Sequence, residues 1–117
     1  MPKILIVEDS RFTRAKVSKF LQENGFEVIE AENGIEAMAL IPEEKPDAVI
    51  TDILMPEMDG YKFLETLKEE GIRVPVIVIT ADIQETTRQR VMELGAVGVS
   101  NKPPQFSELL ELIHSSI

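Results

Sequence analysis

Short apolar runs alternate with helical patterns from one end of this 117-residue chain to the other. Each run has the length of a strand and is followed by a segment whose apolar residues recur at helical spacing. This alternation is typical of a parallel sheet covered by helices on both faces. The predicted strands are Lys3 to Val7, Glu27 to Ala31, Ala48 to Asp52, Val76 to Thr80 and Val97 to Ser100. We therefore predict an α/β fold of the (βα)5 type that forms one domain over residues 1–117.

The order of the strands follows from their connections and their composition. Right-handed crossovers leave few ways to lay these units in one sheet, and the doubly wound order 2-1-3-4-5 puts the most apolar strands in the centre. Pro42 and Pro46 are expected to keep the second helix, which follows Asn33-Gly34, from continuing into the third strand. Ligands bind such sheets at the carboxyl ends of the strands. The residues that follow each strand are therefore the candidate site.

Composition excludes several kinds of chemistry. The chain has no cysteine and one histidine, His114, which rules out disulfides, thiol nucleophiles and zinc-thiolate sites and leaves little for a Ser-His-Asp triad. The balance of 12 basic against 21 acidic residues gives a net charge of −9, which opposes binding to nucleic acid or anionic lipid and suits cations. Apolar stretches fall far short of the ~20 residues that span a membrane. We expect a soluble, cytoplasmic monomer with no nucleic-acid or membrane partner.

Polar and charged residues stand at the carboxyl ends of four predicted strands. They are Glu8-Asp9, Asp52, Thr80 and Lys102. Each could alone be a helix cap or a turn residue. Together, however, they bring three carboxylates to one edge of the sheet, where these groups would repel one another unless a cation bound among them. A site with oxygen ligands and no imidazole or thiolate predicts Mg²⁺, and Lys102 would complete a near-neutral site.

Four motifs, in this order along the chain, carry a resemblance to a known family. They are Val7-Glu8-Asp9-Ser10, the loop from Asp52 to Gly60 (sequence DILMPEMDG), Val78-Ile79-Thr80-Ala81 and Asn101-Lys102-Pro103. With them the whole chain resembles the response-regulator receiver domains of the chemotaxis CheY type, which have a flavodoxin-like sheet. The resemblance implies a two-component response regulator that takes a phosphoryl group from a sensor histidine kinase or phosphotransfer protein. It further implies that the chain is not an enzyme but a phosphoacceptor that assists its own phosphotransfer and dephosphorylation.

The resemblance also implies a role for each residue of the site. Asp52 would be the phosphoacceptor. Once Asp52 is phosphorylated, the domain would signal to an unidentified downstream protein by direct contact. Mg²⁺ would be held by Glu8, Asp9, Asp52 and the backbone carbonyl of Leu54. The phosphoryl oxygens would be bound by the hydroxyl of Thr80, the N–H of Ala81 and the ammonium of Lys102, whose bond to Pro103 is expected to be cis.

Two positions depart from the family pattern. The aromatic residue that usually moves with the switch Thr80 is replaced by Val99, so we expect the signal to leave through the loop Thr80 to Ile83 and the fourth helix. The charged stretch Gln84 to Arg90 on that helix is either a solvated face or a partner surface. Leu54 replaces a polar side chain that can orient water in some relatives, which predicts slow self-dephosphorylation, with Asp82 as a modifier by charge.

Alternative functions fit the residues less well. A haloacid-dehalogenase-like phosphatase also uses an aspartyl phosphate and Mg²⁺, but it carries a second Asp where this chain has Leu54. A flavodoxin binds phosphate in its first loop, where Glu8-Asp9 would repel it, although Tyr61 could stack. A non-phosphorylated pseudo-receiver loses an acid or the Lys, and neither is missing. Within the family, the chain could act in chemotaxis, as a phosphorelay intermediate or as a phosphate sink.

Overall fold

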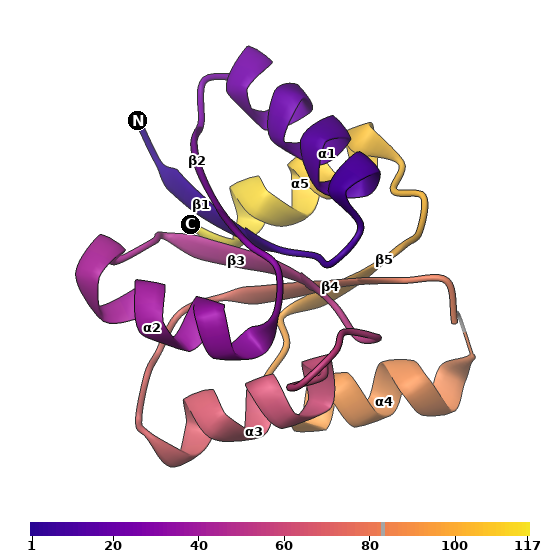
Figure 1. Ribbon diagram of the computed structural model, residues 1–117. Coiled ribbons are helices and arrows are strands. Elements are labelled where there is room, and N and C mark those ends of the chain that lie inside the picture. The colour runs from indigo at the N-terminus through magenta and orange to yellow at the C-terminus, as the bar shows by residue number, and fades with distance from the viewer. Residues whose placement is uncertain (83) are drawn as a thin grey trace.

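The computed structural model describes residues 1–82 and 84–117, in which five strands alternate with five helices (Figure 1). The strands are β1 (Lys3–Val7), β2 (Glu27–Ala31), β3 (Ala48–Asp52), β4 (Val76–Thr80) and β5 (Gly98–Asn101). The helices are α1 (Arg11–Glu23), α2 (Gly34–Glu44), α3 (Gly60–Glu69), α4 (Glu85–Glu93) and α5 (Phe106–Ser116). The predicted (βα)5 order is thus confirmed.

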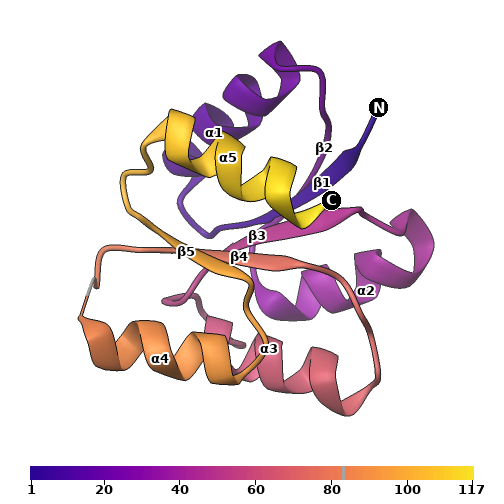
Figure 2. The ribbon, with the colours of Figure 1, turned by 180° about the vertical axis from the view of Figure 1, so that it is seen from behind.

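The strands form one parallel sheet in the order β2-β1-β3-β4-β5, as predicted. Helices α1 and α5 cover one face, and α2, α3 and α4 cover the other (Figures 1 and 2). Because side chains alternate across a strand, Ile4 and Ile6 of β1 pack beneath α1 and α5, whereas Leu5 and Val7 pack on the opposite side. Burial on both faces explains why the central strands are continuously apolar.

Helix α2 extends further than the prolines alone would suggest. Pro42 lies inside the helix, which ends only after Glu44. The residue that closes it is Lys45, which adopts a left-handed conformation (φ 49°) and donates its N–H to the carbonyl of Ile41 at 2.9 Å. A residue before proline is disfavoured in the right-handed helical region, so Pro46 ends the helix. Pro42 lies in the last turn, where the backbone N–H that it lacks would otherwise have bonded to the carbonyl of Met38.

Strand β5 begins one residue later than predicted. The apolar pattern predicts that Val97 belongs to the strand, but its side chain is 46% exposed, and the paired register starts with Gly98 opposite Ile77. The N–H of Val97 still donates to the carbonyl of Val76 at 2.9 Å, so Val97 leads into the sheet without packing against it. Among the helices of the described ranges, none combines the length and the apolar character that crossing a membrane would require.

Candidate functional site

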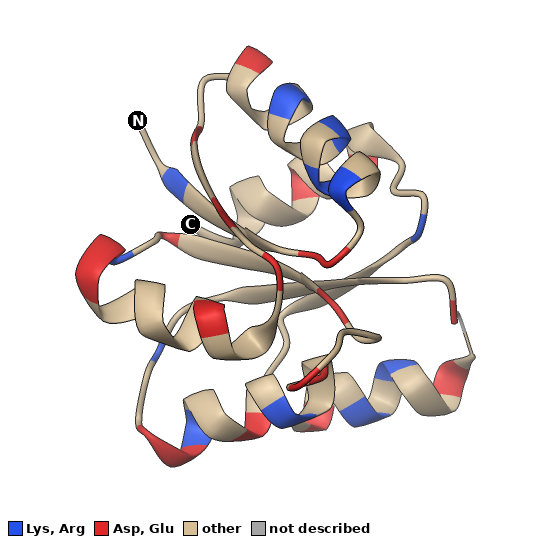
Figure 3. Cartoon of the chain, in the orientation of Figure 1, with Lys and Arg blue, Asp and Glu red and all other residues tan. Residues whose placement is uncertain are grey.

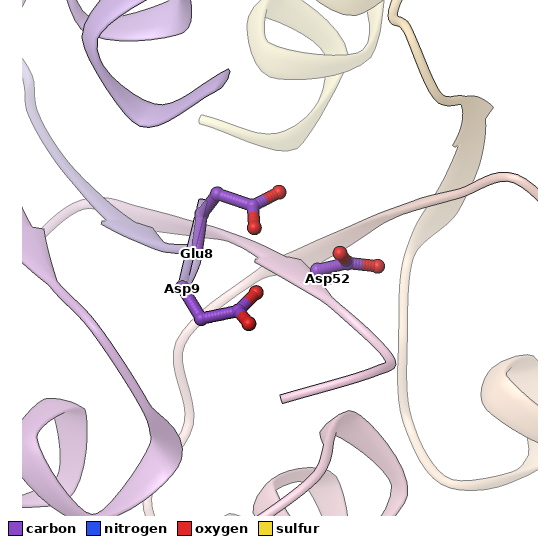
Figure 4. A group of neighbouring side chains, drawn as sticks. All are labelled: Glu8, Asp9 and Asp52. Carbon is purple, nitrogen blue, oxygen red and sulfur yellow. The ribbon is translucent and has the colours of Figure 1, made fainter. Parts of the chain in front are cut away.

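Three carboxylates meet at the carboxyl ends of β1 and β3 (Figure 4). These strands are neighbours in the sheet, so Glu8 and Asp9, which follow β1, lie beside Asp52 at the end of β3. One oxygen from each of the three side chains lies within 4.8 Å of the other two. Glu8 is fully buried and Asp52 is 4% exposed, whereas Asp9 is open to solvent. The cluster is therefore walled by protein on one side and accessible on the other.

Lys102 supplies the positive charge of the site. It follows β5, and its Nζ lies 2.6 Å from Oδ2 of Asp52 and 2.8 Å from Oε1 of Glu8. Its own N–H donates to the carbonyl of Thr80 at 2.9 Å, and the Lys102–Pro103 bond is cis, as expected. Burial works against the ammonium charge, but the contacts with Asp52 and Glu8 outweigh it, so the pKa of Lys102 is raised above 10.5.

The carboxylate of Glu8 shows that a cation would fit. Its Oε2 accepts a hydrogen bond from the N–H of Ser10 at 2.9 Å. Its Oε1, although close to Lys102, has no partner with hydrogen-bond geometry among residues 1–82 and 84–117. Burial raises the pKa of Glu8 above 4.5 despite the ion pair with Lys102 and the Ser10 bond, because a buried negative charge is poorly solvated. An under-coordinated, buried carboxylate beside two further acids is the donor set that Mg²⁺ prefers.

The predicted phosphoryl-binding residues line the same hollow as the acids. This hollow has a volume of about 560 Å³ and is lined by Asp9, Asp52, Ile53, Leu54, Tyr61, Thr80, Ala81, Asp82 and Lys102. Leu54 stands on its rim with 80% of its surface exposed. Val99 instead packs, half-buried, against the core layer beneath α2, α3 and α4. The structure thus gathers eight of the nine predicted site residues, counting Glu8, around one hollow.

A chain of hydrogen bonds leads from Thr80 to α4. The N–H of Asp82 donates to the Thr80 hydroxyl oxygen at 3.0 Å. The carboxylate of Asp82 accepts from the hydroxyl of buried Thr87 at 2.7 Å and from the N–H of Gln84 at 3.1 Å. The hydrogen bond from Thr87 has the larger influence and that from Gln84 the smaller. Together they hold the pKa of Asp82 below 3.8. Ile83, which ends the predicted signalling loop, lies outside the described residues.

Tyr61 is a part of this hollow that our sequence interpretation did not assign to it. It comes from the first turn of α3, and the guanidinium of Arg90 on α4 lies 3.7 Å from the centre of its ring. Such cation–π stacking contributes about 0.5–2 kcal/mol. The sequence suggests a role for Tyr61 only as a stacking residue in a flavodoxin, since nothing in the sequence pairs it with Arg90. The contact gives α4 a second connection to the hollow.

The loop after Asp52 is shaped by close packing. A Cβ atom on Gly60 would lie 2.6 Å from the carbonyl oxygen of Asp52, and the N–H of Gly60 donates to the carbonyl of Ile53 at 2.8 Å. Gly60 is therefore needed for this close approach of the start of α3 to the backbone of Asp52. Met55 and Met58 belong to the core packing on this side of the sheet, and Met58 would meet any side chain at Gly34.

Comparisons with known proteins agree with this geometry. The family model of the response regulator receiver domain matches residues 4–114. Chemotaxis protein CheY of Bacillus subtilis (strain 168) is 38% identical over 116 residues, which cover 98% of this chain and 97% of that protein. A structure of Vibrio cholerae chemotaxis protein CheY4 superposes with a TM-score of 0.92 at 31% identity and covers 100% of this chain and 99% of that one.

Other relatives are longer. Response regulator MprA of Mycobacterium sp. (strain KMS) is 36% identical over 108 residues, which are 92% of this chain but 47% of MprA. The chain therefore spans about half the length of these relatives. The match to the family model covers nearly all of the chain and includes all four motifs that carry the resemblance. From the fold, the site and these matches together, the chain belongs to the response regulator receiver domain family.

Proposed function

We propose that this protein is a two-component response regulator that accepts a phosphoryl group on Asp52 from a phosphohistidine of a sensor kinase or phosphotransfer protein. The observation that carries the proposal is the Lys102 ammonium, which lies 2.6 Å from Asp52 beside the acidic cluster. A phosphoryl acceptor needs a nucleophile, a metal site and a fixed cation in one place. The likeness to chemotaxis protein CheY supports chemotaxis as one setting for this function.

The contacts of the residues support the roles proposed for them. An oxygen of Asp52 forms the bond to phosphorus as the phosphorus–nitrogen bond breaks and the donor imidazole leaves. One oxygen of Asp52 already accepts from the N–H of Ile53 at 2.7 Å, which fixes the carboxylate, while the other faces Lys102. Mg²⁺, held by Glu8, Asp9, Asp52 and the carbonyl of Leu54, would offset the charge of the phosphoryl oxygens. Lys102, Thr80 and the N–H of Ala81 would contact those oxygens.

The signal leaves, in this proposal, through α4. A new group can shift a conformational equilibrium only through contacts that differ between the two states. If the Thr80 hydroxyl turns toward a phosphoryl oxygen, its bond from Asp82 is disturbed, and Asp82 in turn holds Thr87. This route needs no aromatic residue at position 99, where Val99 packs in the core. The charged face of α4 then acts as the partner surface.

The test is phosphorylation by acetyl phosphate with Mg²⁺, followed by intact-protein mass spectrometry. We expect one phosphoryl group on the wild-type protein and none on Asp52→Asn. Asp59→Asn is the matched control, because Asp59 lies in the same loop but caps α3 by accepting from the N–H of Lys62. A protein that stays unmodified would be a pseudo-receiver. Sustained hydrolysis of a phosphate monoester such as p-nitrophenyl phosphate would indicate a phosphatase, and flavin binding would indicate a flavodoxin.

A further inference from the structure

Arg14 is a nearly buried arginine directly behind the acidic cluster. Figure 3 shows that α1 carries several basic residues. Among them, Arg14 is a buried residue of the helix, with a side chain only 10% exposed. Its Nη1 donates to the backbone carbonyl of Glu8 at 2.7 Å. Its Nε donates to Oε1 of Glu30 at 2.9 Å, and Nη2 lies 3.8 Å from Oε1 of Glu32. The guanidinium therefore joins the end of β1 to the end of β2.

This contact fixes the backbone that presents two acids. The N–H of Glu8 donates to the carbonyl of Ala31 at 3.0 Å, and the carbonyl of Glu8 accepts from Arg14. The peptide groups on both sides of the Glu8 Cα are thus held, so the direction of the Glu8 side chain is set. The second of these groups is the peptide between Glu8 and Asp9. Holding this peptide also fixes the position of the Asp9 Cα, from which the exposed side chain extends.

The charge of Arg14 is balanced where it lies. A free positive charge next to a cation site would oppose binding, but Glu30 and Glu32 face the guanidinium from β2 and the residue after it. The planar guanidinium has several donors in fixed directions, which a lysine ammonium cannot reproduce. Arg14 can therefore orient the acids without cancelling their charge.

We propose that Arg14 is a positioning residue of the metal site: through the Glu8 carbonyl it holds the Glu8–Asp9 peptide in the orientation that directs both carboxylates toward Asp52. The inference rests on the proposed function, because it concerns the same cation. Residues that orient ligands from behind contribute roughly 10–100-fold to metal affinity. Ordering this peptide costs conformational entropy, and that cost is met when the chain folds, before any cation binds.

The experiment measures Mg²⁺ affinity by isothermal titration calorimetry, with thermal unfolding followed by circular dichroism. Tyr61, which is the one tyrosine of a chain without tryptophan, lines the hollow, so its fluorescence gives an independent titration. We expect Arg14→Met to bind Mg²⁺ about tenfold more weakly while it remains folded. Lys19→Met is the control, since it removes a positive charge from an exposed position of the same helix but leaves the bond of Arg14 to Glu8, and it should bind nearly as the wild type does.

The outcomes separate this inference from the proposed function. If the wild-type protein fails to bind Mg²⁺, or Asp9→Asn binds it unchanged, the proposed metal site is wrong. If Asp9→Asn loses binding but a folded Arg14→Met keeps wild-type affinity, Arg14 has only a structural role and the inference is overturned. Should Arg14→Met not fold, Arg14→Lys replaces it, and wild-type affinity in that variant would equally overturn the inference.

Discussion

Lys102 and Asp52 form an ion pair with a separation of 2.6 Å, although they are 50 positions apart in the chain. The same ammonium lies 2.8 Å from Glu8, so Lys102 forms ion pairs with two acids that are themselves candidate metal ligands. Lys102 therefore competes electrostatically with a bound metal, while it supplies a partner for incoming phosphoryl oxygens. The two roles should respond in opposite directions when the ammonium is removed.

We expect Lys102→Met to bind Mg²⁺ more tightly than the wild type, because a positive charge leaves the site. Its phosphorylation by acetyl phosphate should be much slower, since no ammonium remains to pair with the phosphoryl oxygens. Calorimetry and mass spectrometry measure the two effects separately. Lys3→Met is the control, because Lys3 pairs with Glu27 and Glu44 away from the site. Weaker Mg²⁺ binding by Lys102→Met would contradict the competition.

The lifetime of the aspartyl phosphate should depend on Leu54. This side chain is 80% exposed on the rim of the hollow, so its replacement should leave the fold unchanged. Leu54→Asn can orient an attacking water through a hydrogen bond of about 0.5–1.5 kcal/mol, which corresponds to a lifetime shorter by up to about tenfold. Decay of the phosphorylated protein, followed by mass spectrometry, measures it. Leu54→Met should match the wild type, and a longer lifetime in Leu54→Asn would show that the apolar side chain does not slow hydrolysis.

The bond between Thr87 and Asp82 should make stability depend on pH at the acidic end. The Thr87 hydroxyl favours the ionised carboxylate, so the pKa of Asp82 in the folded protein is below 3.8. This contribution is complete above pH 3.8 and is lost as the pH falls through the folded pKa. Wild type and Thr87→Val should therefore differ in free energy of unfolding at neutral pH and converge in strong acid.

Nuclear magnetic resonance titration of the Asp82 carboxyl gives a second measure of that bond. Its pKa should rise toward 3.8 in Thr87→Val. Thr66→Val is the matched control, because the exposed Thr66 hydroxyl donates to the carbonyl of Lys62 on the surface of α3. An unchanged titration of Asp82 in Thr87→Val would mean that the hydroxyl does not hold the carboxylate in solution, and the proposed route to α4 would lose this step.

Gly60→Ala should destabilise the protein by about 1–3 kcal/mol, the usual cost of overpacking. The new Cβ would lie 2.6 Å from the carbonyl oxygen of Asp52, and a backbone atom cannot move aside easily. Gly34→Ala is the control, because its Cβ would meet the flexible side chain of Met58 at 2.8 Å. Denaturant unfolding compares the two variants. Equal losses would show that the backbone around Asp52 is free to shift.

The sequence was sufficient for the fold and for most of the site because both depend on strands. Continuous apolar runs identify buried parallel strands, and the doubly wound order then brings Glu8, Asp52, Thr80 and Lys102 to one edge. Helix α2 ends before β3 as predicted, although it includes Pro42, and β5 starts at Gly98 instead of Val97. Helix ends depend on the conformation of single residues such as Lys45, which the apolar pattern does not report.

The contacts that the sequence did not predict involve helical side chains. The stacking of Arg90 on Tyr61 joins α4 to α3, and the bonds of Arg14 join α1 to the ends of β1 and β2. Each depends on the rotation of a helix about its axis and on the rotamer of a long side chain. A charged residue on an amphipathic helix is usually a solvated one, so neither arginine stood out before the packing was known.

The hydrogen bond from the N–H of Gly60 to the carbonyl of Ile53 closes the loop after Asp52 into a ring. Helix α3 is thereby attached to Asp52 through main-chain atoms in direct contact, whereas α4 is attached through the side chains of Asp82, Thr87 and Arg90. A side-chain contact can change partners by rotation about single bonds, whereas the main-chain contacts of Gly60 change only if the loop itself shifts. The acceptor and α3 should accordingly move as one rigid body, and α4 is the element left free to turn against it.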